Sequence, residues 1–245
     1  MERRLRYNEF DQPVGAPVPG WTARPCPPET PMVGQYCRVE KLDADRHAAD
    51  LWAAYGAAPD GRDWTYLFMG PFADFAGYQS FARCAADSAD PLHHAIIETA
   101  TGRAVGTAAL MRMDAANGVL EVGHVIWSPG MQRGRVGTEA TYLLMRRAFD
   151  ELGYRRYEWK CDSLNARSRA AAERYGFRFE GLFRQAIVYK GRSRDTAWYA
   201  ITDGEWPSIR TAFEQWLCPG NFDDGGRQRR SLRAVRESIT GLSPC

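Results

Sequence analysis

Residues 128–184 restrict the possible folds of this chain more than any other segment. Their pattern predicts the end of a strand, a turn rich in Arg and Gly, a helix, a strand, a second helix and a further strand. In the first helix the apolar residues recur at helical spacing, and Gly153 is placed as its C-terminal stop. The apolar positions are Ala140, Leu143, Leu144, Ala148 and Leu152. Strands and helices that alternate in this way indicate the α/β (α+β) class.

The turn that opens the first helix reads Gln-Arg-Gly-Arg-Val-Gly-Thr-Glu-Ala at 132–140. Gly134 and Gly137 allow backbone amides to approach a ligand closely, because neither residue carries a side chain. A helix N-terminus presents unpaired N–H groups and a partial positive charge, which suits a pyrophosphate. Arg133 and Arg135 add charge that phosphate oxygens can bind. The alternative interpretation is an ordinary basic turn between a strand and a helix.

Local signals predict the remaining elements. Asn165 is the predicted N-cap of a short helix that ends at Gly176, and Asp43 is expected to cap an earlier one. Asn117-Gly118 is a strong hairpin signal. The predicted strands are 37–42, 93–98, 104–113, 119–127, 156–161, 179–189 and 195–201, and further helices are predicted around 72–84 and 209–217.

Three pieces together resemble a known family: the turn at 132–140, Asn165 with Ser168, and Tyr-Gly-Phe at 175–177. They resemble the GNAT acetyl-CoA-dependent N-acetyltransferases, closest to the branch that acetylates the N-termini of ribosomal proteins. The resemblance covers roughly residues 34–205. It implies the GNAT fold, a mixed and mostly antiparallel sheet that splays at the cofactor site and is flanked by helices. One departure is Arg135, which stands where the family has its first glycine and cannot match the close approach of glycine.

The resemblance implies how acetyl-CoA is held. The backbone of the splayed strand is implied to bind the thioester carbonyl and the pantetheine arm. Asn165 is implied to lie beside that arm, with Ser168 approaching the thiol. The position of the general-acid tyrosine of many relatives is Ala172 here, so Ser168 or water is expected to protonate the leaving thiolate, and Tyr175 is expected to pack. The implied cofactor-binding residues are Val125, Ile126, Trp127, Gln132, Arg133, Gly134, Arg135, Val136, Gly137, Thr138, Asn165 and Ser168.

Glu121 and His124 are the titratable candidates for the base that deprotonates the amine. Strand alternation is expected to send them to opposite faces of the sheet, so that only one faces the substrate. A glutamate on this strand is the common base in the resembling family, which favours Glu121. A histidine has a pKa near neutrality and would serve as well. For either residue the alternative is a structural role, such as hydrogen bonding across the sheet, and Asp195 is expected to be structural.

The chain is therefore expected to be an N-acetyltransferase that moves an acetyl group directly from acetyl-CoA to a primary amine. A catalytically silent GNAT domain that binds CoA or a protein partner is the main alternative. A Rossmann-type nucleotide-binding protein would need its glycine turn after the first strand, whereas several predicted strands precede the turn here. Ile187 follows Gln185-Ala186 where the ribosomal branch carries a carboxylate, which counts against a ribosomal acceptor. The acceptor is left as a small-molecule or peptide amine.

Three regions are expected: an extended Pro-rich arm at 1–34, the acetyltransferase domain at 35–218 and a basic tail at 219–245. Seven of the fourteen prolines fall within residues 11–34, which disfavours helix and central strand there. The arm is expected to wrap the domain surface, and closure of the substrate pocket by Trp21 is the alternative. The tail is expected to be solvated or locally docked, with a subunit contact in a homodimer as the alternative.

Composition excludes several classes of function. A net charge of +2 gives no case for nucleic-acid binding. No apolar run approaches the length of a membrane span, and the first ten residues lack the apolar core of a signal peptide. The six cysteines show neither C-x-x-C nor metal-ligand spacing, so we expect reduced thiols, no bound metal and a cytoplasmic location.

Overall fold

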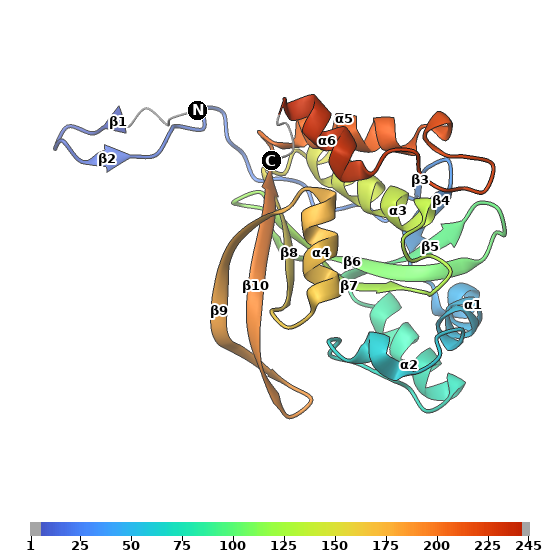
Figure 1. Ribbon diagram of the computed structural model, residues 1–245. Coiled ribbons are helices and arrows are strands. Elements are labelled where there is room, and N and C mark those ends of the chain that lie inside the picture. Colours follow the sequence, from blue (N-terminus) through green and yellow to red (C-terminus); the bar gives the residue numbers. More distant parts are fainter. Residues whose placement is uncertain (1–5, 242–245) are drawn as a thin grey trace.

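The computed structural model describes residues 6–241, so that residues 1–5 and 242–245, Cys245 among them, lie outside the description. A central eight-stranded sheet runs through the molecule in the order β3-β4-β5-β6-β7-β8-β10-β9 (Figure 1). Only β7 and β8 pair in parallel, and every other neighbouring pair is antiparallel. The expected mixed, mostly antiparallel sheet is thereby confirmed. The strands are β3 Met32–Val33, β4 Cys37–Lys41, β5 Leu92–Glu98, β6 Ala104–Asp114, β7 Val119–Trp127, β8 Arg156–Asp162, β9 Arg178–Tyr189 and β10 Arg192–Thr202.

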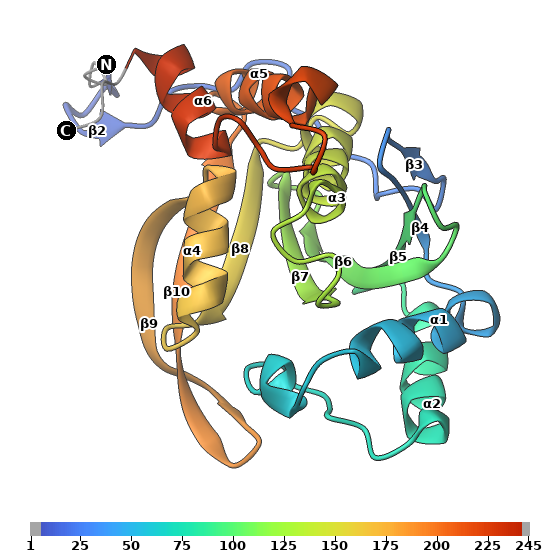
Figure 2. The ribbon, with the colours of Figure 1, turned by 45° about the vertical axis from the view of Figure 1, so that its right-hand side comes forward.

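Helices cover both faces of this sheet, and each face has its own apolar core. On one face lie α1 Ala44–Gly56 and α2 Phe75–Ala86, which pack on β5 and β6. Figure 2 shows α3, α5 and α6 on the opposite face, with α4 in front of β8 and β10. These helices are α3 Arg135–Arg146, α4 Ala166–Tyr175, α5 Trp206–Leu217 and α6 Leu232–Thr240. No helix of the described residues is both long and apolar enough to cross a membrane.

Helix ends follow the local signals in the sequence. The carboxylate of Asp43 accepts hydrogen bonds from the backbone N–H groups of Asp45 and Arg46, so that α1 begins there. Asn165 caps α4 in the same way through the N–H of Ser168, at 3.1 Å. Gly176 ends α4 with φ of 102°, a left-handed conformation that favours glycine. The predicted caps are confirmed, although α3 runs into a π-helical turn, Arg147–Glu151, which the periodicity does not predict.

Strands β7 and β8 pair over only part of their length. Their parallel register runs from Val119–Arg156 to Val122–Trp159, yet β7 continues to Trp127 and β8 to Asp162. Among the described residues, no further ladder joins the two strands. They therefore diverge, and the expected splay of the sheet lies at this point.

The N-terminal arm follows the surface on the side of α3. It contains a small hairpin, β1 Arg6–Tyr7 with β2 Pro13–Val14, which the proline content does not predict. The guanidinium of Arg147 donates hydrogen bonds to the carbonyls of Pro28 and Thr30, at 3.2 and 3.1 Å. Trp21 donates its indole N–H to the carbonyl of Ala116 at 2.8 Å, in the turn between β6 and β7. From Trp21 onward the arm lies on the surface as expected, whereas the β1–β2 hairpin extends away from the domain (Figure 1). Closure of the pocket by Trp21 is wrong, because its indole is held at the turn between β6 and β7.

The basic tail is docked on the domain rather than solvated. A 3-10 turn, Pro219–Asn221, leads to α6, whose Leu232 and Val235 are buried in the core shared with α3 and α5. Arg236 donates hydrogen bonds to the carbonyls of Glu173 and Arg174 at the end of α4, at 3.0 and 3.1 Å. The tail therefore covers the C-terminal end of α4.

Candidate active site

A cavity of about 1390 Å³ lies where β7 and β8 diverge. The turn before α3, the first turns of α4, the strands β9 and β10, and loop residues between Arg62 and Met69 form its other walls. Arg135 and Val136 are the only candidate site residues that do not line it. The sequence-predicted residues in its lining are Glu121, His124, Val125, Ile126, Trp127, Gln132, Arg133, Gly134, Gly137, Thr138, Asn165 and Ser168.

The N-terminus of α3 faces this cavity without a side-chain cap. Gly134 is the N-cap residue, with extended backbone, and no side chain accepts a hydrogen bond from the first N–H groups of the helix. Arg133 adopts φ of 58°, which is uncommon for a residue other than glycine. Uncapped N–H groups at the start of a long helix form a site for an anion.

Arg135 does not obstruct the turn, although it replaces a glycine of the family pattern. It is the first residue of α3, and its guanidinium lies 4.9 Å from the ring centre of Tyr36 and 5.0 Å from that of Phe222. The side chain therefore points away from the cavity and leaves the start of the helix open. Glycine at this position is not required, because Arg135 is outside the positive-φ region.

Gly137 packs tightly against the turn itself. A Cβ atom there would lie 3.3 Å from the carbonyl oxygen of Met131 and 3.4 Å from Nε1 of Trp127. Arg174 of α4, which the sequence does not single out, donates a hydrogen bond to the Thr138 hydroxyl at 3.1 Å and lines the same wall. The side of the cavity formed by the turn before α3 thus carries a second arginine, from a different helix.

The α4 side of the cavity brings Asn165 and Ser168 together. Asn165 acts as a helix cap, and Ser168 Oγ accepts a hydrogen bond from the indole N–H of Trp159 at 2.9 Å. That bond uses an oxygen lone pair of Ser168, and the same hydroxyl also interacts with the Cys161 thiol, which lines the cavity beside it. Tyr175 is buried and stacks on Phe213, so its predicted packing role is confirmed.

Glu121 lies on the cavity floor in a buried charge cluster. Lys160 Nζ is 2.7 Å from one carboxylate oxygen of Glu121 and 2.7 Å from one of Glu158. The same ammonium lies 3.8 Å from the ring centre of Trp198. Burial raises the pKa of Glu121 above its ordinary value, although the ion pairs with Lys160 and Arg112 favour the charged form. A raised pKa brings a carboxylate closer to the range of a useful base.

His124 lies on the same face of the sheet as Glu121, so the expected separation to opposite faces is wrong. Ala109 of β6 pairs with Gly123 of β7. Two residues earlier in β6, Thr107 pairs with Ile126, which comes three residues after Gly123 in β7. The mismatch is a β-bulge that adds one residue to β7, where His124 has φ of 48°. Side chains after the bulge therefore point to the opposite face from the one that regular alternation would give them. The His124 ring contacts His93, with ring centres 5.0 Å apart. Burial lowers the pKa of His124 below its ordinary value.

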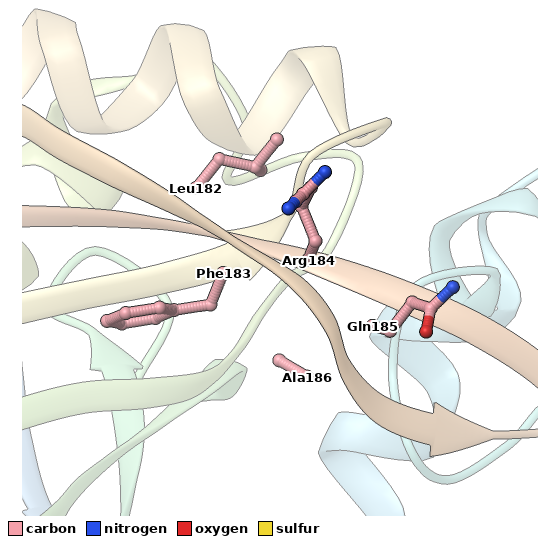
Figure 3. A pocket seen from close by; sticks show the side chains of 5 residues that line it. All are labelled: Leu182, Phe183, Arg184, Gln185 and Ala186. Carbon is pink, nitrogen blue, oxygen red and sulfur yellow. The ribbon is translucent and has the colours of Figure 1, made fainter.

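Strands β9 and β10 form the wall opposite β7, and β9 is irregular there. Asp195 Oδ1 accepts a hydrogen bond from the backbone N–H of Gln185 at 2.7 Å and holds this irregularity, which confirms its structural role. Phe183 and Ala186 point to one side of β9, while Leu182 and Arg184 point to the other (Figure 3). These residues also border a separate hollow of about 780 Å³ on β9. Only Phe183 and Ala186 among the four line the large cavity.

The tip of the β9–β10 hairpin closes one end of the cavity. Lys190 donates hydrogen bonds to the carbonyls of Trp64, Met69 and Gly70, at 2.8, 3.2 and 2.6 Å. The loop that carries these carbonyls also supplies Phe68 to the cavity wall. This end of the cavity is therefore a bounded space between the loop and the two strands.

Comparison with known proteins identifies the family. Residues 38–178, more than half of the chain, match the family described as "Acetyltransferase (GNAT) domain". The chain therefore belongs to the GNAT acetyltransferase family. This confirms the resemblance inferred from the turn and from Asn165, and members of the family generally use acetyl-CoA.

Solved structures and a curated relative agree with this assignment. A GCN5-related N-acetyltransferase from Brucella melitensis is 46% identical with a TM-score of 0.88, covering 90% of this chain and 100% of that one. A Chromobacterium violaceum structure described as a "probable" acetyltransferase of the GNAT family is 39% identical with a TM-score of 0.74, covering 80% of this chain and 98% of that one. The Bacillus subtilis (strain 168) protein named "Putative ribosomal N-acetyltransferase YdaF" is 31% identical over 105 residues. That match spans 43% of this chain and 57% of the relative.

Proposed function

We propose that this protein is an acetyl-CoA-dependent N-acetyltransferase that transfers the acetyl group directly to a primary amine. The observation that carries the proposal is the divergence of β7 and β8 beside the uncapped N-terminus of α3. Around one cavity lie the uncapped start of α3, a strand edge that β8 leaves unpaired and the buried carboxylate of Glu121, and these support the proposal. Membership of the GNAT family supports the same activity.

The cofactor fits the residues present. The pyrophosphate of CoA would lie over residues 133–138, where the first N–H groups of α3 face the cavity and Arg174 adds positive charge. The pantetheine arm would follow the edge of β7 at Val125–Trp127 that β8 leaves unpaired, with Asn165 beside it. When bound, acetyl-CoA supplies the thioester whose acetyl group is transferred.

Different groups of the cavity would take the proton and stabilise the two developing negative charges. Glu121, directly or through a water, accepts the proton that the amine loses as its nitrogen bonds to the acetyl carbon. Backbone N–H groups at Val125–Trp127 stabilise the negative charge that develops on the carbonyl oxygen. As the carbon–sulfur bond breaks, the hydroxyl of Ser168 donates a hydrogen bond to the departing thiolate. No residue forms a covalent bond with the acetyl group in this scheme.

A screen for CoA release over amine classes tests this function, with mass spectrometry of the acetylated product. Peptide N-termini, polyamines, aminosugars and antibiotic amines are the classes to include. Ile187 lines the acceptor side where the ribosomal branch carries a carboxylate, so we do not propose a ribosomal-protein acceptor. A protein that binds CoA tightly but releases it with none of these amines would instead be the catalytically silent domain.

Replacing Gly137 by valine is expected to weaken CoA binding at least about tenfold, because overpacking a tight site costs roughly 1–3 kcal/mol. The new side chain would press on Met131 and Trp127 and displace the turn that presents the helix N-terminus. Isothermal calorimetry with CoA measures the effect. A Cβ atom at Gly130 in the same loop would have no neighbouring atom within 4 Å, so Gly130→Val is the matched control. Equal affinities in the two variants would remove this turn from the proposed cofactor site.

Replacing Ser168 by alanine is expected to lower kcat about tenfold while the affinity for CoA stays nearly unchanged, because the lost hydrogen bond forms to a charge that develops only as sulfur leaves. Single-turnover kinetics and calorimetry separate the two effects. Ser163, in the preceding turn and outside the cavity lining, provides the control Ser163→Ala. Full turnover in Ser168→Ala would assign the role to water.

A further inference from the structure

Arg194 of β10 is a buried cation in the wall of the acceptor side. Its side chain lines the large cavity, and only 6% of the residue's surface is exposed. Nε donates a hydrogen bond to the Thr196 hydroxyl at 3.1 Å, and the guanidinium lies 5.4 Å from the ring centre of Phe68 and 5.9 Å from that of Tyr189. Within residues 6–241 it forms no ion pair. Both terminal amino groups of the guanidinium lack a hydrogen-bond acceptor in this part of the chain.

Other buried cations of this protein are compensated. Lys160 lies between two carboxylates, and Arg147 is held by Glu151 and two backbone carbonyls. Asp162, which pairs with Thr196 across the ladder, forms no ion pair with Arg194. Its two oxygens accept hydrogen bonds from the Leu164 N–H and the Tyr189 hydroxyl. A buried charge without a partner is unfavourable, so the surroundings of Arg194 suit an anion that arrives from outside.

Arg194 lies on the same face of the sheet as Glu121. Along β10, Arg194, Thr196 and Trp198 line the cavity, while Ala197 and Tyr199 belong to the core on the other face. Trp198 covers the ammonium that pairs with Glu121, and Arg194 is four residues away, or about 13 Å along the strand. A ligand with its amine near Glu121 can therefore extend along β10 toward Arg194.

We propose that Arg194 binds a carboxylate carried by the amine acceptor, so that the acceptor is a small amino acid or short peptide with both groups. This inference rests on the proposed acetyl transfer. The planar guanidinium matches a carboxylate through two parallel hydrogen bonds, and Arg194 lines the cavity that the acceptor would occupy. The rings of Phe68 and Tyr189 lie against the guanidinium and help to position it.

The test compares glycine, diglycine, triglycine and tetraglycine with their C-terminal amides as acceptors in a CoA-release assay. The wild-type protein is expected to prefer the acid over the amide roughly 10- to 100-fold in kcat/KM at one or two of these lengths, the range for hydrogen bonds to a charged group. Arg194→Met is expected to abolish the preference and to keep the rate with the amide. Arg194→Lys is expected to retain part of it.

Arg184 provides the matched control, because its side chain points away from the cavity on the neighbouring strand (Figure 3). Arg184→Met should keep the full preference for the acid. Arg194→Met should melt no earlier than the wild type, since the substitution removes a buried charge that has no partner. Melting curves thus separate loss of folding from loss of recognition.

Three outcomes decide the inference. Equal kcat/KM for acid and amide at every length in the wild type would overturn it and leave acetyl transfer intact. A preference that survives in Arg194→Met would overturn it as well. If no glycine peptide gives CoA release, calorimetric titration of the CoA-bound protein with the same peptides tests whether Arg194 binds their carboxylate. If the wild type binds the peptide acids and Arg194→Met does not, the carboxylate site is supported. If the wild type does not bind the acids, the inference is overturned.

Discussion

Replacing Glu121 by glutamine is expected to lower kcat/KM about 100- to 1000-fold at neutral pH, the range for loss of a positioned general base. Glutamine keeps the size of the side chain but cannot accept the proton of the amine. The pH profile of CoA release should also lose its acid limb. That limb requires the carboxylate form, so the rate is full above the pKa of Glu121 and falls as the pH drops through it.

The control for this substitution is Glu158→Gln. Glu158 is the other carboxylate at 2.7 Å from Lys160, but it does not line the cavity. Breaking either ion pair disturbs Lys160 similarly, whereas only Glu121 is placed to accept a proton from a ligand. A loss of rate that is equal in the two variants would assign Glu121 a structural role in the charge cluster.

His124→Asn is the second comparison, because the bulge in β7 brings His124 into the same cavity. If Glu121 is the base, this variant keeps the midpoint of the acid limb. The midpoint alone does not identify the base, since burial raises the pKa of Glu121 and lowers that of His124, which moves the two values toward each other. Loss of the limb in His124→Asn but not in Glu121→Gln would make the histidine the base. A limb that survives in both would mean that the amine arrives neutral.

Replacing Glu139 by alanine is expected to lower the free energy of unfolding by about 3–5 kcal/mol, as for other buried charges with several hydrogen bonds. This buried carboxylate on α3 accepts hydrogen bonds from the backbone N–H groups of Gln35, Tyr36 and Cys37, at 2.8, 2.6 and 2.7 Å. Alanine would leave three donors without acceptors at the start of β4. Urea denaturation followed by circular dichroism measures the change.

Glu173→Gln is the matched control, since Glu173 is an exposed carboxylate on α4 and its loss should change stability by roughly 0.5 kcal/mol or less. Gly34 provides an independent check. A Cβ atom there would clash with the Glu139 carboxylate, so Gly34→Ala should destabilise the protein through the same contact. A change below about 1 kcal/mol in Glu139→Ala would show that the three hydrogen bonds are not essential to the fold.

Much of the secondary structure and part of the site could be predicted because their causes are local. Asp43 and Asn165 cap helices through backbone groups two or three residues away, and Gly176 ends α4 through its own φ. The residues of the turn at 132–140 are neighbours in the chain, so its glycines and the helix that follows could be recognised together. Most of its residues line the cavity. The tail helix α6 could not be predicted in this way, because it is stabilised by packing on α4 and α5.

The amino-acid sequence by itself determined the family, the order of most elements and the turn that opens α3 at the cavity, since each depends on residues that are neighbours in the chain. Only the tertiary structure decided which faces those residues share. Glu121 and His124 share a face because the register between β6 and β7 slips by one residue, and no spacing within β7 reveals this. Lys160 and Arg194 reach the acceptor side only when β8 and β10 pair, so their partners, or lack of them, depend on contacts between distant segments.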